Sequence, residues 1–501
     1  MPIALLSSYF AIKNSSKALE ESMLRLISRG AQRDCSGVSR RDFMQVGSLA
    51  LGSLSLPAML ASQALASPEF LRDRSVVLLY LSGGASHIET FDPKMSAPAG
   101  VRSVTGEVQT SIPGVTFGGT FPELAKRAKR LSVVRSFQHP VGSHDQAHVH
   151  VLSGGTDRIG NGAKTHSIGA AYARLRGTNH PDTGMPTFSL LTEKEVDGQY
   201  SKELKRVIKG SAPGILGPSY APFGLSTIKS ASKHTRRSSK SAGSIRDNMQ
   251  LNLELDRFDD RRELLRKLDL LNQKMDSSGS LVGIDRFKRQ AVDMIMGKAS
   301  EAFDVTQEDP RLVERYDTSH IDIGFKKFRK STLGHQLLLA RRLCQAGCGF
   351  VTVHSAGWDM HADNNNPGMT VGMEMLGRTL DKAVSAFIDD VKQQGLTDKI
   401  LLVVTGDFGR TPKMNSRGGR DHWARLATLA FSGGGLEMGQ VIGQSARGAD
   451  TPASDPISTE NLMATIMHSL FDVGELRLQP QLPAELLRWV QNHEPIKQLM
   501  S

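Results

Sequence analysis

Cysteine is scarce in this sequence, with three among 501 residues. Cys35 lies in the leader predicted below, which leaves Cys344 and Cys348 in the mature chain, four positions apart near the end of a predicted helix. A disulfide at that spacing would strain a regular helix, so we interpret both as small core residues. The sequence therefore carries no disulfide framework.

Long hydrophobic runs are also missing. The best candidate follows Arg40 and Arg41 and ends in the A-x-A sequence of Ala64 to Ala66, but it is too short and too weakly apolar for a stable membrane span. Paired arginines before such a run are typical of a Tat signal, although an amphipathic helix with a basic start is an alternative. We expect residues 1–66 to be a leader, with initiation at Met1 or Met23, and the mature chain to be periplasmic or otherwise extracytoplasmic.

Aromatic residues make up 6% of the chain, and they are absent from its most basic run, residues 229–246, apart from one His. The net charge of +11 would suggest a nucleic-acid partner, but much of the excess is concentrated in this Ser-rich run and in "KELKRVIKG". Without stacking residues or a recognised motif, we interpret these runs as solvated loops and expect no nucleic-acid partner.

Strand-like and helix-like segments alternate after the leader. "SVVLLYL", "GFVTV" and "KILLVVTG" are continuous apolar runs, as expected for strands buried on both faces. "FPELAKRAKR", "STLGHQLLLARRLCQAG" and the apolar spacing from Leu376 to Val391 predict helices between strands. We therefore expect residues 67–501 to form an α/β domain with a mostly parallel sheet. Basic loops and charged helices between about 185 and 330 predict a helical insertion.

Polar residues follow the predicted strands at their carboxyl ends, where open α/β sheets bind ligands. These residues are Ser82, Ser86 and His87 after the first strand, Asp359, His361 and Asp363 after "GFVTV", Asp407 after "LLVVTG", and Asp421 and His422 in "GGRDHW". A further segment, "GSHDQAHVHVLSGG", begins with a capping-box pattern, Ser143 and Gln146, and ends at Gly154 or Gly155. His144 would be its first helical residue, where the helix dipole favours a neutral imidazole.

The motifs "LSGGASHIETFDPK", "SHDQAHVHVLSGG", "GWDMHADN", "GDFGRTP" and "GRDHW" resemble the Tat-exported family called domain of unknown function 1501. That family is related to the alkaline phosphatase and sulfatase superfamily. The resemblance runs from about residue 40 to about residue 475. It implies an alkaline-phosphatase-like, three-layer αβα fold with a largely parallel central sheet.

Carried over residue by residue, the resemblance implies one retained metal site. His361 and His422 match histidine ligands of the superfamily. Gly357 stands where the superfamily has an Asp, so Asp359 would replace that ligand from a shifted position. Asp359, His361 and His422 would then hold one metal ion.

The second metal site of the superfamily is altered. Asp407 matches the Asp of an Asp-His pair whose His is Phe408 here. Ser82 stands where the superfamily has an Asp that bridges to the second metal, and His87 or Asp92 would substitute for that Asp. The nucleophile position falls on His144, or on Ser143 if the register slips by one, and His144 or His87 would complete the site as a metal ligand.

The resemblance thus implies an exported, metal-dependent hydrolase of phosphate or sulfate esters, acting on a small ester or a sulfated polysaccharide. Mixed His and carboxylate ligands suit zinc, with manganese or iron as alternatives. Arg410 and Arg420 would clamp the anion, or else form salt bridges that stabilise their loop. The alternative is a non-catalytic extracytoplasmic binding or scaffold protein that keeps the fold, with or without one metal.

Overall fold

The computed structural model describes residues 70–157, 160, 162, 165–192, 198–226, 299–479, 482, 486 and 493–500. The predicted leader, residues 1–66, lies outside the described residues, as do the basic run 229–246 and the charged helix predicted after it. Within the described ranges, no helix is both long enough and apolar enough to cross a membrane.

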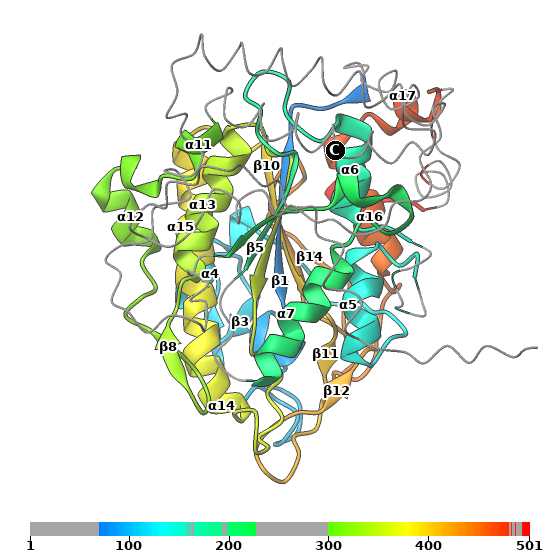
Figure 1. Cartoon of the computed structure of the whole chain (residues 1–501). Helices are drawn as coiled ribbons and strands as arrows, with labels where there is room; N and C mark the ends of the chain where they lie inside the picture. Colours follow the sequence, from blue (N-terminus) through cyan, green and yellow to red (C-terminus); the bar gives the residue numbers. More distant parts are fainter. Residues whose placement is uncertain are drawn as a thin grey trace, which may run out of the picture.

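An eight-stranded sheet forms the centre of the molecule (Figure 1). Every neighbouring pair is parallel except the two pairs made by β13, so the predicted mostly parallel α/β sheet is confirmed. The strands in spatial order are β14 (Val441–Ile442), β4 (Ser132–Val134), β13 (Leu429–Gly433), β10 (Ile400–Gly406), β1 (Ser75–Leu81), β9 (Phe350–Ser355), β5 (Phe188–Thr192) and β6 (Phe223–Ser226).

The central strand β1 explains why the protein has three layers. All seven of its residues are buried, and they alternate between two hydrophobic clusters. Val77 and Leu79 pack in one cluster, and Val76 and Leu78 pack in the other. Because successive side chains of a strand point to opposite faces, a fully apolar strand needs helices on both sides. Each fully buried Val or Leu stabilises the fold by about 1.5–3 kcal/mol.

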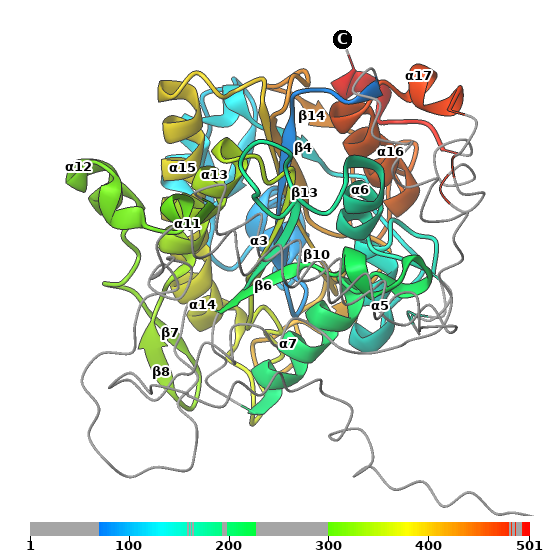
Figure 2. The ribbon, with the colours of Figure 1, turned by 45° about the horizontal axis from the view of Figure 1, so that its top comes forward.

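Helices cover both faces of the sheet, as Figures 1 and 2 show. One face packs against α4 (Pro122–Lys126), α11 (Ala299–Ala302), α12 (Pro310–Tyr316), α13 (Leu333–Gln345), α14 (Met369–Gly372) and α15 (Arg378–Gln393). The other face packs against α5 (His144–Leu152), α6 (Ile168–Arg176), α7 (Gly198–Gly210), α16 (Thr459–Leu470) and α17 (Val473–Arg477). The fold is therefore a three-layer αβα sandwich.

Smaller elements complete the described chain. The helical ones are α3 (His87–Thr90), the π-helical turn η6 (Met373–Gly377) between α14 and α15, and the 3₁₀ turns η2 (Ala128–Arg130), η3 (Gly214–Leu216), η4 (Pro218–Tyr220), η5 (Val305–Gln307) and η7 (Lys497–Leu499). The two-stranded pairs are β2 (Glu107–Gln109) with β3 (Thr116–Gly118), β7 (Asp322–Gly324) with β8 (Phe328–Lys330), and β11 (Gly409–Arg410) with β12 (His422–Trp423).

Two segments inside the predicted insertion, about 185–330, belong to the main sheet. β5 pairs with β9 and with β6, in parallel, and α7 connects β5 to β6 along the chain. A parallel connection of this kind needs a crossover, which a helix usually supplies. The first part of the region therefore extends the sheet, and the charged pattern of its loops hid two short strands.

Candidate metal centre

Three elements converge beyond the carboxyl ends of β9 and β10. His144 is the first residue of α5, as predicted. Asp359 lies in the loop that follows β9, which ends at Ser355. His422 lies on β12, opposite Arg410 of β11, and β11 follows β10 after a short turn. Parallel strands end at one edge of a sheet, so these separate segments meet there.

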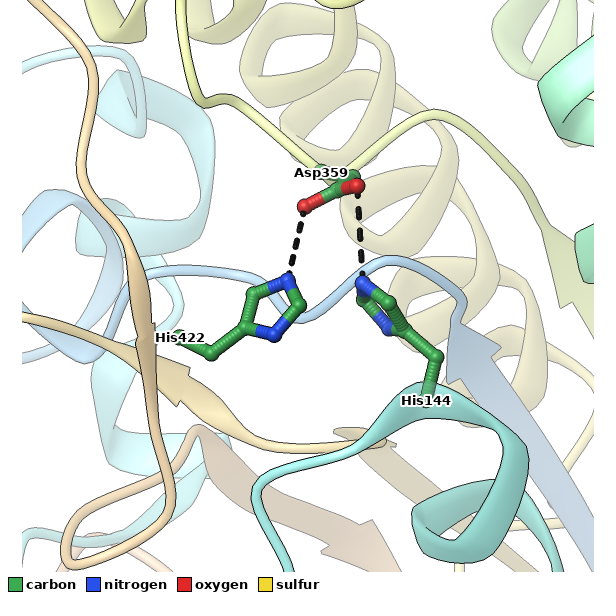
Figure 3. A group of neighbouring side chains, drawn as sticks. All are labelled: His144, Asp359 and His422. Carbon is green, nitrogen blue, oxygen red and sulfur yellow. Dashed lines mark ion pairs between the residues drawn. The ribbon is translucent and has the colours of Figure 1, made fainter.

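His144, Asp359 and His422 form the centre of this site (Figure 3). Among the described residues they make a group in which the candidate ligand atoms all lie within 4.8 Å of one another. Nε2 of His144 is 3.4 Å from Oδ2 of Asp359, and Nε2 of His422 is 3.4 Å from Oδ1. Each imidazole therefore faces a different oxygen of one carboxylate.

Both facing nitrogens are buried and make no hydrogen bond of normal geometry in the described part of the chain, although each forms an ion pair with Asp359. The separation of 3.4 Å from Asp359 exceeds the usual N–H···O distance of about 2.9 Å. Two imidazole nitrogens that converge on one carboxylate at more than hydrogen-bond distance are placed as metal ligands would be. Two His and one carboxylate are a ligand set that zinc enzymes use, and the residues fit a divalent metal.

His144 is fixed by a second carboxylate. Its Nδ1 forms a short hydrogen bond with Oδ2 of Asp407, whose Oδ1 accepts a bond of 3.0 Å from the backbone N–H of Gly83. An imidazole that donates Nδ1–H to a carboxylate keeps Nε2 for a metal, as in many zinc sites. Asp407, which we predicted as a metal ligand, thus lies behind His144 and outside the group of three.

The charge of His144 differs from our expectation of a neutral imidazole. Burial alone would lower the pKa of His144, but the carboxylates of Asp407 and Asp359 outweigh burial and raise it to about 8. The two carboxylates therefore dominate over the helix dipole on which the expectation relied. In the metal-free protein His144 is largely protonated at pH 7, so binding of a metal at Nε2 must release a proton.

Asp359 and His422, in contrast to His144, are already in the protonation states that metal ligands need. Burial would raise the pKa of the Asp359 carboxyl, but the guanidinium of Arg410 and the neighbouring imidazoles hold it well below its usual range. Burial lowers the pKa of His422. At neutral pH the site thus presents an ionised carboxylate and a neutral imidazole at His422, which are the forms that bind metals.

Arg410 is fully buried, and the structure shows the salt-bridging arrangement that was one of its two predicted roles. It pairs with Asp359, and its Nε and Nη1 donate to the carbonyls of Gly84 and Arg420 at 2.9 and 3.1 Å. Another donor bonds to the carbonyl of Gly83. The guanidinium thereby ties β12 and the end of β1 to Asp359.

Arg420 is engaged in the same way. It is fully buried, its Nη2 lies 3.0 Å from Oε1 of Glu89, and it also donates to carbonyls of the surrounding loops. Because both guanidinium groups are directed at protein acceptors, a role as an anion clamp would require these bonds to be exchanged for substrate. The geometry favours a positioning role for both arginines.

Phe408 fills space beside the group of three. Its ring centroid lies 4.7 Å from that of His144 and 4.6 Å from that of His422, and the side chain is buried. The resemblance places a histidine ligand at this position. Among the described residues, the candidate ligand atoms around this apolar ring form a single group, which could hold one metal ion.

Gly357 explains why the loop supplies its carboxylate from position 359. Its φ is +95°, a conformation that L residues with side chains rarely adopt. A Cβ at this position would also lie 3.0 Å from the ring of Tyr200. An Asp at 357 would therefore be strained and crowded, whereas Asp359 reaches the site without either cost.

His361 lies beside the group of three and not within it. Its Nδ1 is 2.9 Å from Oδ1 of Asp421, and its Nε2 is 3.0 Å from Oδ1 of Asp359 and 3.3 Å from Nη1 of Arg410. The structure therefore brings His144, more than His361, into the ligand set that we predicted around Asp359 and His422. His361 thus contacts the same carboxylate, Asp359, that the other two histidines face.

The remaining predicted residues lie outside the group of three. Nε2 of His87 is 3.0 Å from the carbonyl of Ala449, and burial lowers the pKa of His87 to about 4. Ser143 is the exposed N-cap of α5, but its side chain makes no capping bond, so the predicted capping box does not form. Asp92 bonds to Ser445 and lies near basic side chains.

His148 supports the site from behind and was not among the predicted site residues. Its Nδ1 donates to the carbonyl of His144 at 2.8 Å, and its Nε2 therefore accepts from the hydroxyl of Ser82, also at 2.8 Å. Burial lowers the pKa of His148 to about 4, so the ring stays neutral. The four-residue spacing from His144 was the signal in the sequence, because it puts both rings on one helix face.

A family model matches most of the chain. The family model described as "Protein of unknown function (DUF1501)" matches residues 73–489. No curated protein matches the chain.

Solved structures resemble the chain at low identity. The PsFucS1 sulfatase from Pseudoalteromonas sp. is 11% identical, with a TM-score of 0.34 over 83% of this chain and 72% of that one. The alkaline phosphatase from the Antarctic bacterium TAB5 is 12% identical, with a TM-score of 0.30 over 73% and 92%. Ps i-CgsB, solved in complex with k-i-k-neocarrahexaose, is 9% identical, with a TM-score of 0.36 over 85% and 78%.

Proposed function

Because this chain belongs to the DUF1501 family, whose function is unknown, we propose its activity from the candidate metal centre. The proposal is a metal-dependent hydrolase of phosphate or sulfate esters. The observation that carries it is the convergence of the buried Nε2 atoms of His144 and His422 on one carboxylate, Asp359, at 3.4 Å each. The sequence resemblance to the alkaline phosphatase and sulfatase superfamily supports the choice of ester.

The donor set favours zinc within this proposal, with manganese or iron as alternatives. Two imidazoles and one carboxylate match the three protein ligands of catalytic zinc sites, which keep one position open, whereas structural zinc sites have four protein ligands. A divalent metal supplies Lewis-acid polarisation of an ester oxygen and makes a water nucleophilic at neutral pH. The site is therefore proposed to be catalytic and mononuclear.

The residues around the group of three would prepare the site for that chemistry. Asp407 holds the ring of His144, and Arg410 holds Asp359. The side chain of His422 is 31% exposed, compared with 9% for His144, so the substrate would approach from the side of His422. We assign His144 as a ligand and not as a nucleophile, because both of its nitrogens face carboxylates.

The nucleophile in this proposal is water. The hydroxyl of Ser143, the residue before His144, is exposed and makes no capping bond, so it remains the alternative nucleophile. The predicted Tat leader adds export to the proposal, so the substrate would be an extracytoplasmic phosphate or sulfate ester, either small or carried on a sulfated polysaccharide.

A binding or scaffold protein with one metal is the second candidate. Phe408 in place of a ligand favours it, since the ring occupies space that a second metal site would need. Against it, three protein ligands with a partly exposed histidine are fewer than a closed structural site uses. We therefore prefer the hydrolase.

Hydrolysis of small chromogenic esters tests the proposal. We expect the purified protein to hydrolyse p-nitrophenyl phosphate or p-nitrophenyl sulfate, and removal of the metal with a chelator to lower the rate by at least about 100-fold. Added zinc or manganese should restore the rate, because the ligands remain in place. Circular dichroism would establish that the chelated protein is folded.

Two outcomes would contradict the hydrolase. One is a folded, metal-loaded protein that hydrolyses neither ester class, which would favour the scaffold. The other is an ester hydrolysis rate that survives complete removal of the metal, which would place the chemistry elsewhere in the chain.

A further inference from the structure

A basic, aromatic hairpin lies outside the candidate metal centre. β7 and β8 with the turn between them, residues 322–330, carry four basic residues and one acidic residue; we call this segment the basic hairpin. Lys326, Lys327 and Lys330 are exposed. The side chain of Phe328 is 62% exposed, although it stands between these cations. An apolar ring and several ammonium groups are therefore accessible together on one short segment.

The backbone of the basic hairpin is well anchored. Asp322 pairs with Lys330 across the two strands, with 3.1 Å between their charged groups. Ile323 is buried in the same hydrophobic cluster as the helices of that face, whereas Phe328 points away from the core. The exposed side chains are therefore presented on a fixed frame, which lowers the entropy lost on binding.

The basic hairpin adjoins the loop that carries Asp359. Nζ of Lys326 lies 3.3 Å from Oδ1 of Asn365 in that loop. Gly324 and Arg329 of the hairpin line a hollow together with Gly357, which precedes Asp359 by two residues. Figure 1 shows β8 at the same end of the molecule as β11 and β12. A chain bound along the hairpin would thus run past the loop of the metal centre.

We propose that the basic hairpin binds an anionic polysaccharide whose sulfate or phosphate ester is presented to the metal centre. Presentation of the ester to the metal centre rests on the proposed hydrolase, whereas binding of the polysaccharide does not. The ring of Phe328 offers an apolar face for a sugar ring, and the ammonium groups of Lys326 and Lys327 pair with ester anions on neighbouring sugars. Interleaved aromatic and cationic side chains match a polymer that alternates apolar ring faces and charges.

A single-stranded nucleic acid is the other polyanion with ring faces. Its binding sites use several aromatic side chains in series, on which successive bases stack. On the basic hairpin Phe328 is the strongly exposed aromatic side chain, since Phe325 is half-buried. The observations therefore favour the polysaccharide, and nucleic acid becomes an outcome of the test.

The test measures binding of dextran sulfate to the full-length protein by titration calorimetry at several salt concentrations. Replacing both Lys326 and Lys327 by Ala should weaken binding by about 10-fold and make it less dependent on salt, because two ion contacts are lost. Phe328→Ala should weaken binding by about 5-fold, and Phe328→Tyr should retain wild-type affinity. Metal content should not change in these variants, because the hairpin contributes no ligand.

A matched control removes the same charge from other parts of the surface. Lys129 lies in η2 and Lys392 in the last turn of α15, and both side chains are exposed. The double variant Lys129→Ala with Lys392→Ala should bind dextran sulfate within about twofold of wild type. Equal losses in both double variants would show a general charge effect and would overturn the proposal.

Other results would also overturn it. One is a wild-type protein that does not bind dextran sulfate. Another is a set of hairpin variants that bind dextran sulfate as tightly as wild type does. The third is a wild-type protein that binds an oligothymidylate more tightly than dextran sulfate. Because binding is measured without turnover, failure of the hydrolase remains distinguishable. If the protein hydrolyses no ester but the hairpin variants lose dextran sulfate binding, the binding surface is supported and the hydrolase is contradicted.

Discussion

Replacing Asp359 with asparagine is expected to lower zinc affinity and ester hydrolysis by at least about 100-fold each. The carboxylate lies between the Nε2 atoms of His144 and His422, at 3.4 Å from each, and it is paired with Arg410. Asparagine keeps the shape but removes the charge, and its amide nitrogen is not a metal ligand. Competition with a chromogenic chelator would measure the affinity.

Asp363 provides the control for this substitution. It lies in the same loop, and its Oδ1 accepts hydrogen bonds from the backbone N–H groups of Asn365 and Asn366. Asparagine at 363 can preserve both bonds through its oxygen, so Asp363→Asn should bind zinc as wild type does. If a folded Asp359→Asn protein also binds zinc with wild-type affinity, the metal is held elsewhere.

Replacing Arg410 with methionine is expected to destabilise the protein by about 3–5 kcal/mol, because Asp359 loses its buried partner. The substitution also leaves the carbonyls of Gly83 and Gly84 without the donors that they have now. Thermal and denaturant-induced unfolding would measure the loss. Zinc affinity should fall as well, because the guanidinium of Arg410 pairs with the Asp359 carboxylate and favours its ionised form.

This substitution separates the two predicted roles of Arg410. If the guanidinium were chiefly an anion clamp, Arg410→Met would leave stability almost unchanged and raise the KM for the ester. The exposed Arg417, in the loop between β11 and β12, is the control, and Arg417→Met should change stability by less than about 0.5 kcal/mol. A stable Arg410→Met protein with a raised KM would contradict our positioning role.

The sheet was predictable because its central strands carry unmistakable apolar runs. β1, β9 and β10 lie side by side with every residue buried, so apolar residues occur on both faces of these strands. β5 and β6 were missed because they are short strands within a region dominated by charged loops. Strand length and flanking composition, not the fold, set that limit.

Asp359 and His422 were predictable from the sequence because polar residues at strand ends meet at one edge. The exchange of His361 for His144 in the ligand group was not, because it depends on ring orientation. Asp421 turns His361 towards Asp359 and Arg410, whereas Asp407 turns His144 towards the open side of the same carboxylate. These orienting hydrogen bonds join residues that are far apart in the chain, so the sequence does not show them.

Backbone conformation and burial account for the rest. The φ of +95° at Gly357 cannot be deduced from one sequence, and it is the reason that the carboxylate comes from Asp359. Nor does a sequence show that Arg410 is fully buried, which changes it from a candidate clamp into a partner of Asp359. The charge of His144 likewise follows from two carboxylates that only the fold brings together.

The most direct test of the central claim is the metal content of the purified, folded protein by inductively coupled plasma mass spectrometry. Our account predicts about one equivalent of zinc, manganese or iron per chain, because Phe408 leaves ligands for one ion. The His144→Ala and His422→Ala variants should each lose that equivalent. A folded wild-type protein that carries no metal and takes none up, or variants that keep it, would contradict the candidate metal centre.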